Sequence, residues 1–180
     1  MKTIVQRPTE KIEREESLAQ FRSALSSKEA QFTQSAIEQL IDEHAKNLTD
    51  NFVVMDADEL KCPIIQGDIK LYHESSDYYK SVINSLTNLK ETDNFNLQIG
   101  KARTGDHRII PLAGAKVTVK EGMFKPKDNI LNGRSYDCKH IVSDQPFLIK
   151  HSEHGNIAVQ KGTYLVFTAI NPKDRTRIID

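Results

Sequence analysis

The spacing of the apolar residues changes near residue 95, and this change limits the folds that the chain can adopt. Before it, apolar residues recur every three or four positions, which is the period of an amphipathic helix. After it, they alternate with polar residues, which is the period of a half-buried strand. We therefore predict an α+β protein. Residues 1–94 form a mostly helical region with amphipathic N-terminal helices, and residues 95–180 form an antiparallel β-sandwich or small β-barrel of jelly-roll or cupin-like geometry.

Three helices are expected in the first region. One begins near Thr9, and Ser26 opens a second helix, 26–48, because a glutamate three residues later completes a capping box. Ser75 or Ser76 caps a third helix, 76–90. The faces that these last two helices bury are Phe32, Ala36, Ile37, Leu40, Ile41, His44 and Leu48 in the second, and Tyr79, Val82, Ile83, Leu86 and Leu89 in the third.

Short strands are expected throughout the second region, with turn sequences such as LNGRS and EHGN between them. The first region also contains a short apolar run at 52–55, and the alternation around 69–71 suggests a strand. The alternating pairs and runs of the second region are Phe95, Leu97 and Ile99; Val117 and Val119; Phe147 and Ile149; Ile157 and Val159; and Tyr164, Val166, Thr168 and Ile170.

The composition favours a cytoplasmic protein. Charged residues make up 28% and hydrophobic residues 38% of the chain, an ordinary globular balance. The chain contains no apolar run long enough to cross a membrane, and its N-terminus lacks the apolar core of a secretory signal. Cys62 and Cys138 are too few for a disulfide framework, so we expect two free, buried thiols in a reducing compartment.

The net charge of zero hides an uneven distribution. Residues 1–94 carry 11 Lys and Arg against 17 Asp and Glu, and residues 95–180 carry 14 against 8. Solvated helix faces can account for the acidic half. Alternatively, the basic half contacts an acidic partner, which is either nucleic acid or the acidic region of another copy. Because an amphipathic helix must bury its apolar stripe, we also expect homo-oligomers that form through the N-terminal helices.

Histidines form the only constellation with the chemistry of a site. Four of the six histidines lie in the second region. If the strand at 147–149 continues, His151 and Glu153 project to the same side, and His154 begins the following turn. With His107 these side chains can bind a divalent metal such as Zn, Fe or Mn. The alternatives are loop histidines without a ligand and one histidine that acts as a general base. The spacing matches neither HExxH nor the cupin motif.

Other catalytic motifs are absent from the sequence or have a structural explanation. No GxxxxGK[ST], GxGxxG or GxSxG string occurs. Cys138 and His140 can share a strand face as a nucleophilic dyad, although a buried structural thiol explains Cys138 more simply. Phe124 lies among basic residues and can serve as an exposed ring for base stacking, but no nucleic-acid-binding motif accompanies it.

Three segments of the second region resemble a β-rich module of uncharacterised bacterial and phage-related proteins. They are GDHRI at Gly105–Ile109, HSEHGNIAVQKGTY at His151–Tyr164, and DRTRIID at Asp174–Asp180. The resemblance covers less than half of the chain and implies no activity. The chain departs from the module's first turn, because Asp106 precedes a single histidine, His107. If the histidines of the module bind a metal together, this chain retains three nitrogens at most.

The sequence therefore favours a non-enzymatic binding or assembly protein that acts through its surfaces. The resemblance adds a phage or mobile-element origin to this hypothesis. A metal-dependent enzyme with a His/Glu site at the mouth of a small barrel is the alternative, and a nucleic-acid-binding accessory protein is a further alternative. The first hypothesis is favoured because the helices 26–48 and 76–90 must each bury an apolar stripe, and such a helical pair attached to a β-sandwich is a common way to build an assembly.

Overall fold

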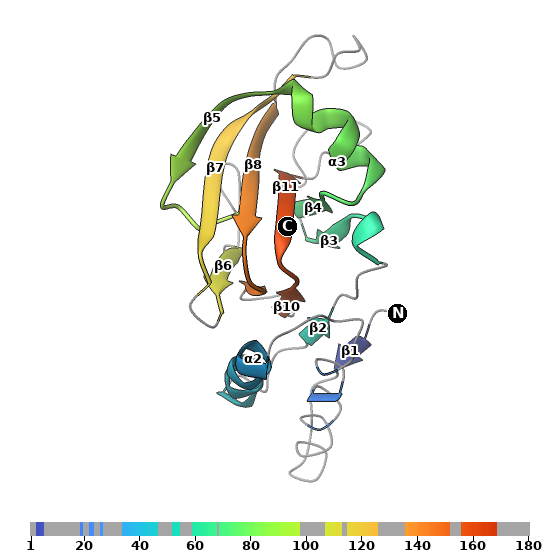
Figure 1. Cartoon of the computed structure of the whole chain (residues 1–180), viewed down its shortest axis with the longest axis vertical. Helices are drawn as coiled ribbons and strands as arrows, with labels where there is room; N and C mark the ends of the chain where they lie inside the picture. The colour runs from blue at the N-terminus through green and yellow to red at the C-terminus, as the bar shows by residue number, and fades with distance from the viewer. Residues whose placement is uncertain are drawn as a thin grey trace.

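The computed structural model describes two sheets and two α-helices (Figure 1). The described residues are 3–5, 19, 22–23, 26, 34–46, 52–54, 59–67, 69–97, 107–112, 115–125, 136–151 and 156–168. Short 3-10 turns at Glu59–Lys61 and Ile83–Ser85 connect neighbouring elements.

The five-stranded sheet joins strands from both ends of the chain. Its order is β1 (Thr3–Val5), β2 (Phe52–Val54), β10 (Asn156–Val159), β9 (Phe147–Lys150) and β6 (Arg108–Pro111). Its pairs are antiparallel except β2 with β10, which run parallel.

The six-stranded sheet is antiparallel throughout. Its order is β3 (Ile64–Gln66), β4 (Ile69–His73), β11 (Gly162–Thr168), β8 (Tyr136–Ser143), β7 (Val117–Phe124) and β5 (Leu86–Thr92).

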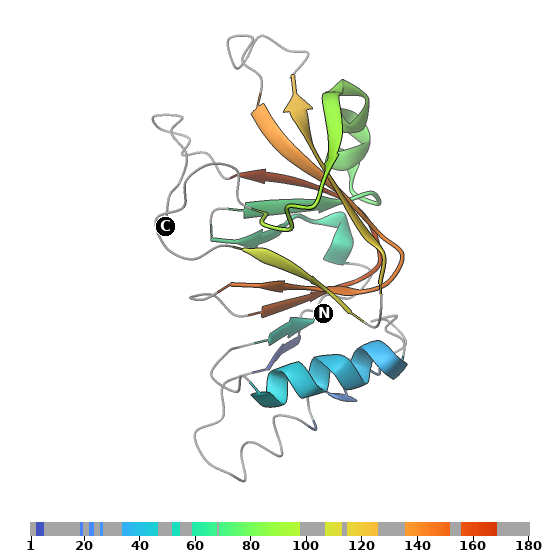
Figure 2. The ribbon, with the colours of Figure 1, turned by 90° about the vertical axis from the view of Figure 1, so that its left-hand side faces the viewer.

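The two sheets share one hydrophobic core. They face each other, and the side chains of their inner faces form a single buried cluster (Figure 2). The expected mixture of helices with mostly antiparallel strands in two sheets is confirmed. In the described part of the chain the sheets stay open, so no closed barrel is formed. The core residues of the two sheets are Ile109, Phe147, Ile149, Ile157 and Val159 on the five-stranded sheet, and Ile69, Leu71, Val119, Ile141, Tyr164 and Val166 on the six-stranded sheet.

One charged side chain lies among these inner faces. Lys139 on β8 is 2% exposed, and its Nζ lies 3.0 Å from the Glu121 carboxylate. The same Nζ also donates to the Asn96 carbonyl. A buried ammonium needs such partners, because burial without them would cost several kcal/mol.

The alternation of apolar residues predicted five of the eleven described strands. The pairs at 117–119, 147–149, 157–159, 164–168 and 69–71 lie on β7, β9, β10, β11 and β4, and the run at 52–54 forms β2. At Phe95 and Leu97 the chain forms only an isolated bridge, between Asn96 and Arg108. Ile99 and Ile170 lie outside the described residues.

The expectation that residues 1–94 are mostly helical is wrong for the described residues. Five strands, β1 to β5, come from this region, and they enter both sheets. The predicted boundary at residues 94 and 95 therefore does not separate one sheet from the other. The reason is physical: β2 and β4 bury apolar side chains by pairing with β10 and β11, which come from residues 156–168, and β3 pairs in turn with β4.

The helix α2 (Gln34–Lys46) covers part of the predicted helix 26–48. It lies beside the β2 and β10 end of the five-stranded sheet (Figures 1 and 2). Its apolar face is buried within one chain, with exposed fractions of 0 to 9% at Ala36, Ile37, Leu40 and Ile41. At the predicted start, Ser26 is an exposed turn residue whose amide donates to the Arg22 carbonyl at 3.0 Å. Residues 27–33, the side chains of His44 and Leu48, and most of the helix expected near Thr9 lie outside what the structure describes.

The predicted helix 76–90 is right at its start and wrong at its end. Ser76 caps α3 (Asp77–Val82) by accepting a hydrogen bond from the Tyr79 amide. The helix then gives way to β5, which contains Leu86 and Leu89. A bulge between Thr87 and Lys90 shifts the alternation of β5 by one residue. The two leucines therefore point to the same side at a spacing of three, which imitates a helical stripe.

Among the described residues, no helix is both long enough and apolar enough to span a membrane.

Candidate functional site

The structure brings together His107 and His151, two of the four residues of the hypothetical metal site. Arg108 on β6 pairs with Lys150 on β9, so the residues one step beyond, His107 and His151, stand opposite each other. Alternation from Ile109 and Ile149 directs both imidazoles toward the core side. The ring centroids are 4.2 Å apart with an interplanar angle of 31°, and the residues are 1% and 3% exposed. The pair is thus two imidazoles in ring contact at the end of the sandwich core.

The other two predicted metal ligands, Glu153 and His154, lie outside the described residues. Within the described ranges, no three His, Cys, Asp or Glu side chains are placed to hold a metal ion. The geometry therefore brings two of the four predicted ligands together. Two imidazole nitrogens suit transition metals such as Zn, but a structural Zn site has four ligands, so the pair alone is half of such a site.

A second candidate site lies on the outer face of the six-stranded sheet, the face turned away from the core. The register places Tyr72, Leu165 and His140 side by side on this face, on β4, β11 and β8. The short helix α3 lies over part of it (Figure 1). The large hydrophobic side chains that are exposed within the described residues all belong to this face, by register or by their position on α3: Ile65, Tyr78, Leu89 and Val142.

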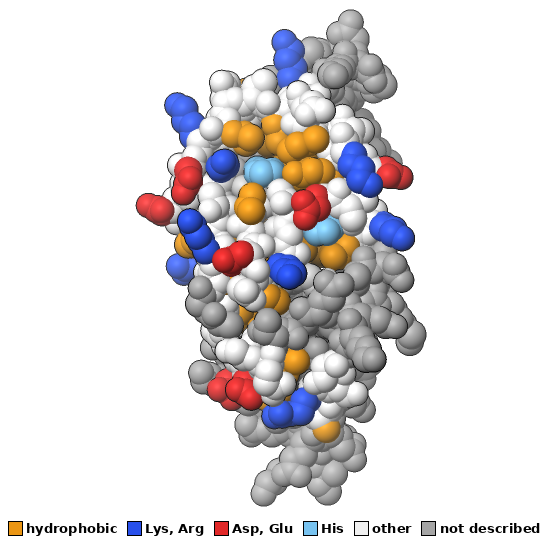
Figure 3. All heavy atoms as spheres, in the orientation of Figure 1, with side chains coloured by type: hydrophobic (Ala, Val, Ile, Leu, Met, Phe, Trp, Pro, Cys, Tyr) orange, Lys and Arg blue, Asp and Glu red, His pale blue; other side chains and the backbone are white. Residues whose placement is uncertain are grey.

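Four aromatic rings on this face form a continuous cluster, which we call the aromatic cluster: Tyr72, Tyr78, Phe124 and Phe167. The rings of Tyr72 and Tyr78 are 4.2 Å apart, and both lie 6.1 Å from Phe167 in edge-to-face contacts. Phe124 reaches Phe167 at 5.6 Å. Tyr78 is 41% exposed, and the other three are half-buried. Figure 3 shows hydrophobic side chains gathered on this side of the molecule around a histidine.

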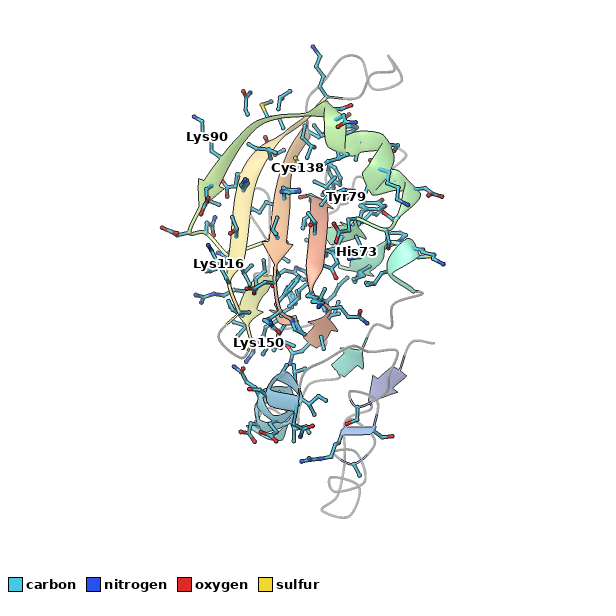
Figure 4. All side chains as sticks on the ribbon, viewed as in Figure 1. His73, Tyr79, Lys90, Lys116, Cys138 and Lys150 are labelled. Atoms are coloured by element: carbon cyan, nitrogen blue, oxygen red, sulfur yellow. The ribbon has the colours of Figure 1, made fainter. Side chains whose placement is uncertain are left out.

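Polar groups border the aromatic cluster at the end of α3. The Tyr79 hydroxyl lies 3.2 Å from Nε2 of His140. His73, the last residue of β4, pairs with the core residue Tyr164, and their rings are 4.8 Å apart, so its imidazole stands at the inward edge of the sheet; Figure 4 labels it and Tyr79. The His73 Nδ1 is 2.8 Å from the Ser75 hydroxyl, and its Nε2 is 3.8 Å from the Glu74 carboxylate.

Burial sets the protonation of these groups. It lowers the pKa of His73, although the nearby Glu74 carboxylate opposes the change. Burial and the positive charge of Lys120 lower the pKa of His140, and Glu74 again opposes them. Burial raises the pKa of Tyr79, and Glu74 adds to this increase. At neutral pH the site therefore contains two neutral imidazoles, a neutral phenol and one carboxylate.

Cys138 shares the outer face of β8 with His140, but it is not a nucleophile. Burial and the adjacent Asp137 raise the pKa of its thiol to about 11, whereas a reactive cysteine has a lowered pKa. These properties favour the buried structural thiol over the alternative of a dyad, and the His140 imidazole contacts the Tyr79 hydroxyl instead. Cys138 is buried and Cys62 is exposed, so the expectation of buried thiols holds for Cys138 alone.

Sequence reasoning found Phe124 as a candidate stacking ring but missed its three partners. A signal was present, because Tyr72 and Phe167 occupy outward positions of alternating strands whose inward residues are apolar. An aromatic residue at an outward-facing strand position, where a polar residue is usual, indicates that the outer face of the sheet is partly apolar. Tyr78 had no such signal, since its place depends on where α3 lies over the sheet.

Comparison with protein-family models, with curated proteins and with solved structures found no match. The resemblance of residues 105–180 to a bacterial and phage-related module therefore stays a prediction.

Proposed function

We propose that the chain is a non-enzymatic binding protein that contacts a protein partner through the outer face of its six-stranded sheet. The aromatic cluster is the observation that carries this proposal. Tyr and Phe are enriched at the centres of protein interfaces, and a concentration of exposed apolar side chains on one face is typical of an interaction surface. The cluster has no role in the shared core, because its rings stand on the opposite side of the sheet.

The charge on this face favours a protein over a nucleic acid. Lys, Arg, Asp and Glu side chains are interspersed around the apolar area (Figure 3). A nucleic-acid surface would instead carry a basic stripe along the backbone path. The alternative proposal, an accessory nucleic-acid-binding protein, is therefore supported only by Phe124 and by the net positive charge of region 95–180.

Panning a displayed peptide library on the wild-type protein tests the proposed function. We expect peptides that bind the wild-type protein and bind the double variant Tyr78→Ala/Phe167→Ala at least tenfold more weakly, a change of about 1.4 kcal/mol. Ile110→Ala is a matched truncation on the five-stranded sheet and should leave binding unchanged. Retained peptide binding in the double variant would contradict the proposal. A single-stranded DNA oligonucleotide that binds in place of peptides, and fails to bind the double variant, would favour the nucleic-acid alternative.

A second proposal, a metal-dependent site, is favoured by the contact of His107 and His151. Two of the four predicted ligands meet, from segments more than forty positions apart in the sequence. If Zn, Fe or Mn binds there, the bound metal stabilises the native state. Metal-loaded protein should then melt at a lower temperature after addition of a chelator, and the variant His107→Gln/His151→Gln should lose this difference. Identical melting curves of wild-type protein with and without chelator would exclude the site.

A third proposal is that the chain forms homo-oligomers. The apolar stripe of the N-terminal helix, which motivated this prediction, no longer supports it. The described apolar residues of α2 are buried within one chain, so they need no cover from another copy. The remaining support is the charge distribution, with an acidic region at 1–94 and a basic region at 95–180. Association that involves the N-terminal helices would then depend on charge rather than on an apolar stripe.

A further inference from the structure

Glu74 brings a half-exposed carboxylate to the border of the aromatic cluster. It follows β4 directly, and its amide donates to the Thr163 carbonyl of β11 at 2.9 Å, which fixes its position against the sheet. Its side chain is 49% exposed. Its carboxylate lies 3.8 Å from the His73 imidazole, and it precedes by two residues Ser76, whose hydroxyl accepts from the Tyr79 amide. The charge of Glu74 also acts on His140 and Tyr79. Figure 3 shows an acidic side chain beside two histidines on this face.

The negative charge of Glu74 is not neutralised by the described residues around it. His73 is the one basic side chain among them that comes within ion-pair distance of the carboxylate, at 3.8 Å. Burial lowers the pKa of His73, so its imidazole carries no charge at pH 7. Lys80 is paired with Asp77 at 3.9 Å. Lys120 lies on β7, three strand positions from β4, which corresponds to roughly 14 Å across a sheet.

The neighbours of Glu74 also suit a positive charge. Tyr79 lies within its electrostatic reach, and Tyr78 adjoins Tyr79 on α3, 4.2 Å from the Tyr72 ring. Aromatic faces attract ammonium and guanidinium groups, most strongly where water is partly excluded. The neutral imidazoles of His73 and His140 add no positive charge that would compete with a ligand.

We infer that the outer face recognises a protein segment that presents an arginine or lysine side chain, which pairs with the Glu74 carboxylate and lies against the rings of Tyr78 and Tyr79. This inference rests on the proposed function and defines the chemistry of the partner. The apolar residues next to the arginine or lysine in the partner segment contact the aromatic cluster. The Glu74 carboxylate makes binding specific for a positively charged side chain. The site therefore discriminates against a segment of the same shape without the charge.

An NMR titration of the ¹⁵N-labelled full chain tests this inference with two defined probes. One is the peptide Ac-Leu-Arg-Leu-NH₂, and the other replaces its arginine with the neutral isostere citrulline. We expect the arginine peptide to shift amide signals of residues 72–80 and 163–167 and to bind about fivefold more tightly than the citrulline peptide, as one partly exposed charged contact allows. Glu74→Gln should remove this preference. Glu38→Gln on α2 removes the same charge at a distance and should preserve it.

The outcomes separate the two proposals. Equal binding of both peptides at this face, lost in Tyr78→Ala/Phe167→Ala, would overturn the role of Glu74 and leave the proposed function intact. A preference for arginine that persists in Glu74→Gln would also overturn the inference. Shifts confined to other parts of the chain, or an absence of shifts with either peptide at millimolar concentration, would count against the binding face itself.

Discussion

Gly162 determines how closely β11 approaches His73. Its φ is +143°, and a Cβ atom at this position would lie 2.4 Å from Nε2 of His73 and 3.4 Å from the Glu74 carboxylate. Any other residue would therefore strain the backbone and displace the imidazole. The positions of the His73 and Glu74 side chains therefore depend on the absence of a side chain at residue 162 of β11.

The variant Gly162→Ala should consequently be less stable by about 1 to 3 kcal/mol. Urea denaturation measures this loss, and the exposed neighbour provides a control, since Lys161→Ala should change stability by less than about 0.5 kcal/mol. NMR signals of the His73 ring should also shift in Gly162→Ala. An unchanged unfolding midpoint would show that the backbone can relax around the added methyl group.

His140 should make the stability of the fold depend on pH. Its pKa is lowered in the folded state by burial and by Lys120, whereas in the unfolded chain it returns to about 6.5. As the pH falls below about 6.5, the unfolded state binds a proton before the folded state does, so the free energy of unfolding decreases. The full contribution of the neutral imidazole is therefore present above this pH and is lost as the pH falls toward the folded-state pKa.

Removing the imidazole isolates this effect. Between pH 7 and pH 5.5 the free energy of unfolding of His140→Gln should fall less steeply than that of the wild-type protein, measured by urea denaturation at each pH. His73 contributes in the same direction, so part of the slope should remain. A slope identical to wild type, or an NMR titration that places the His140 pKa above 6.5, would refute the assignment.

At the scale of elements, α3 depends on a single capping residue. The Ser76 hydroxyl accepts from the Tyr79 amide at 3.2 Å and donates to the His73 carbonyl at 2.7 Å. It therefore fixes the start of α3 relative to the end of β4. Because α3 carries Tyr78 and Tyr79, the same serine also determines where these rings stand over the sheet.

Ser76→Ala should lower stability by about 1 kcal/mol, the usual cost of losing an N-cap. It should also weaken peptide binding, since Tyr78 and Tyr79 lose their fixed position. Ser81→Ala is the matched control within the same helix, because the Ser81 hydroxyl bonds only its own turn through the Tyr78 carbonyl. Thermal unfolding and the peptide titration measure both effects. Equal losses in the two variants would mean that the cap has no special role.

The extent to which sequence predicts these elements depends on where each finds its partners. β7, β9, β10 and β11 are visible in the sequence because each alternates over at least one pair of apolar residues without interruption. β5 is hidden by its bulge, which gives Leu86 and Leu89 a helical spacing.

The candidate sites likewise contain parts that the local sequence pattern predicts and parts that it does not. The sequence named His107 and His151 as candidate ligands of one site, but their contact follows from the register between β6 and β9, which the sequence pattern did not predict. The aromatic cluster combines a helix with three nonconsecutive strands, whose order is a property of tertiary structure and not of local pattern.

At the scale of the whole molecule, the distribution of charge leads to a test of self-association. The proposed self-association rests on attraction between the acidic region at 1–94 of one copy and the basic region at 95–180 of another, since the described apolar face of α2 is already buried. Association through charge alone should disappear when salt reduces the screening length to roughly 3 Å at 1 M. We therefore expect a light-scattering mass above 20.4 kDa at high protein concentration and low salt, and a mass of 20.4 kDa at 1 M NaCl.

Sucrose at matched osmolality is the control, since it leaves the charges unscreened. A mass of 20.4 kDa at every protein concentration in low salt would exclude homo-oligomers, and association that persists unchanged at 1 M salt would require an apolar interface instead.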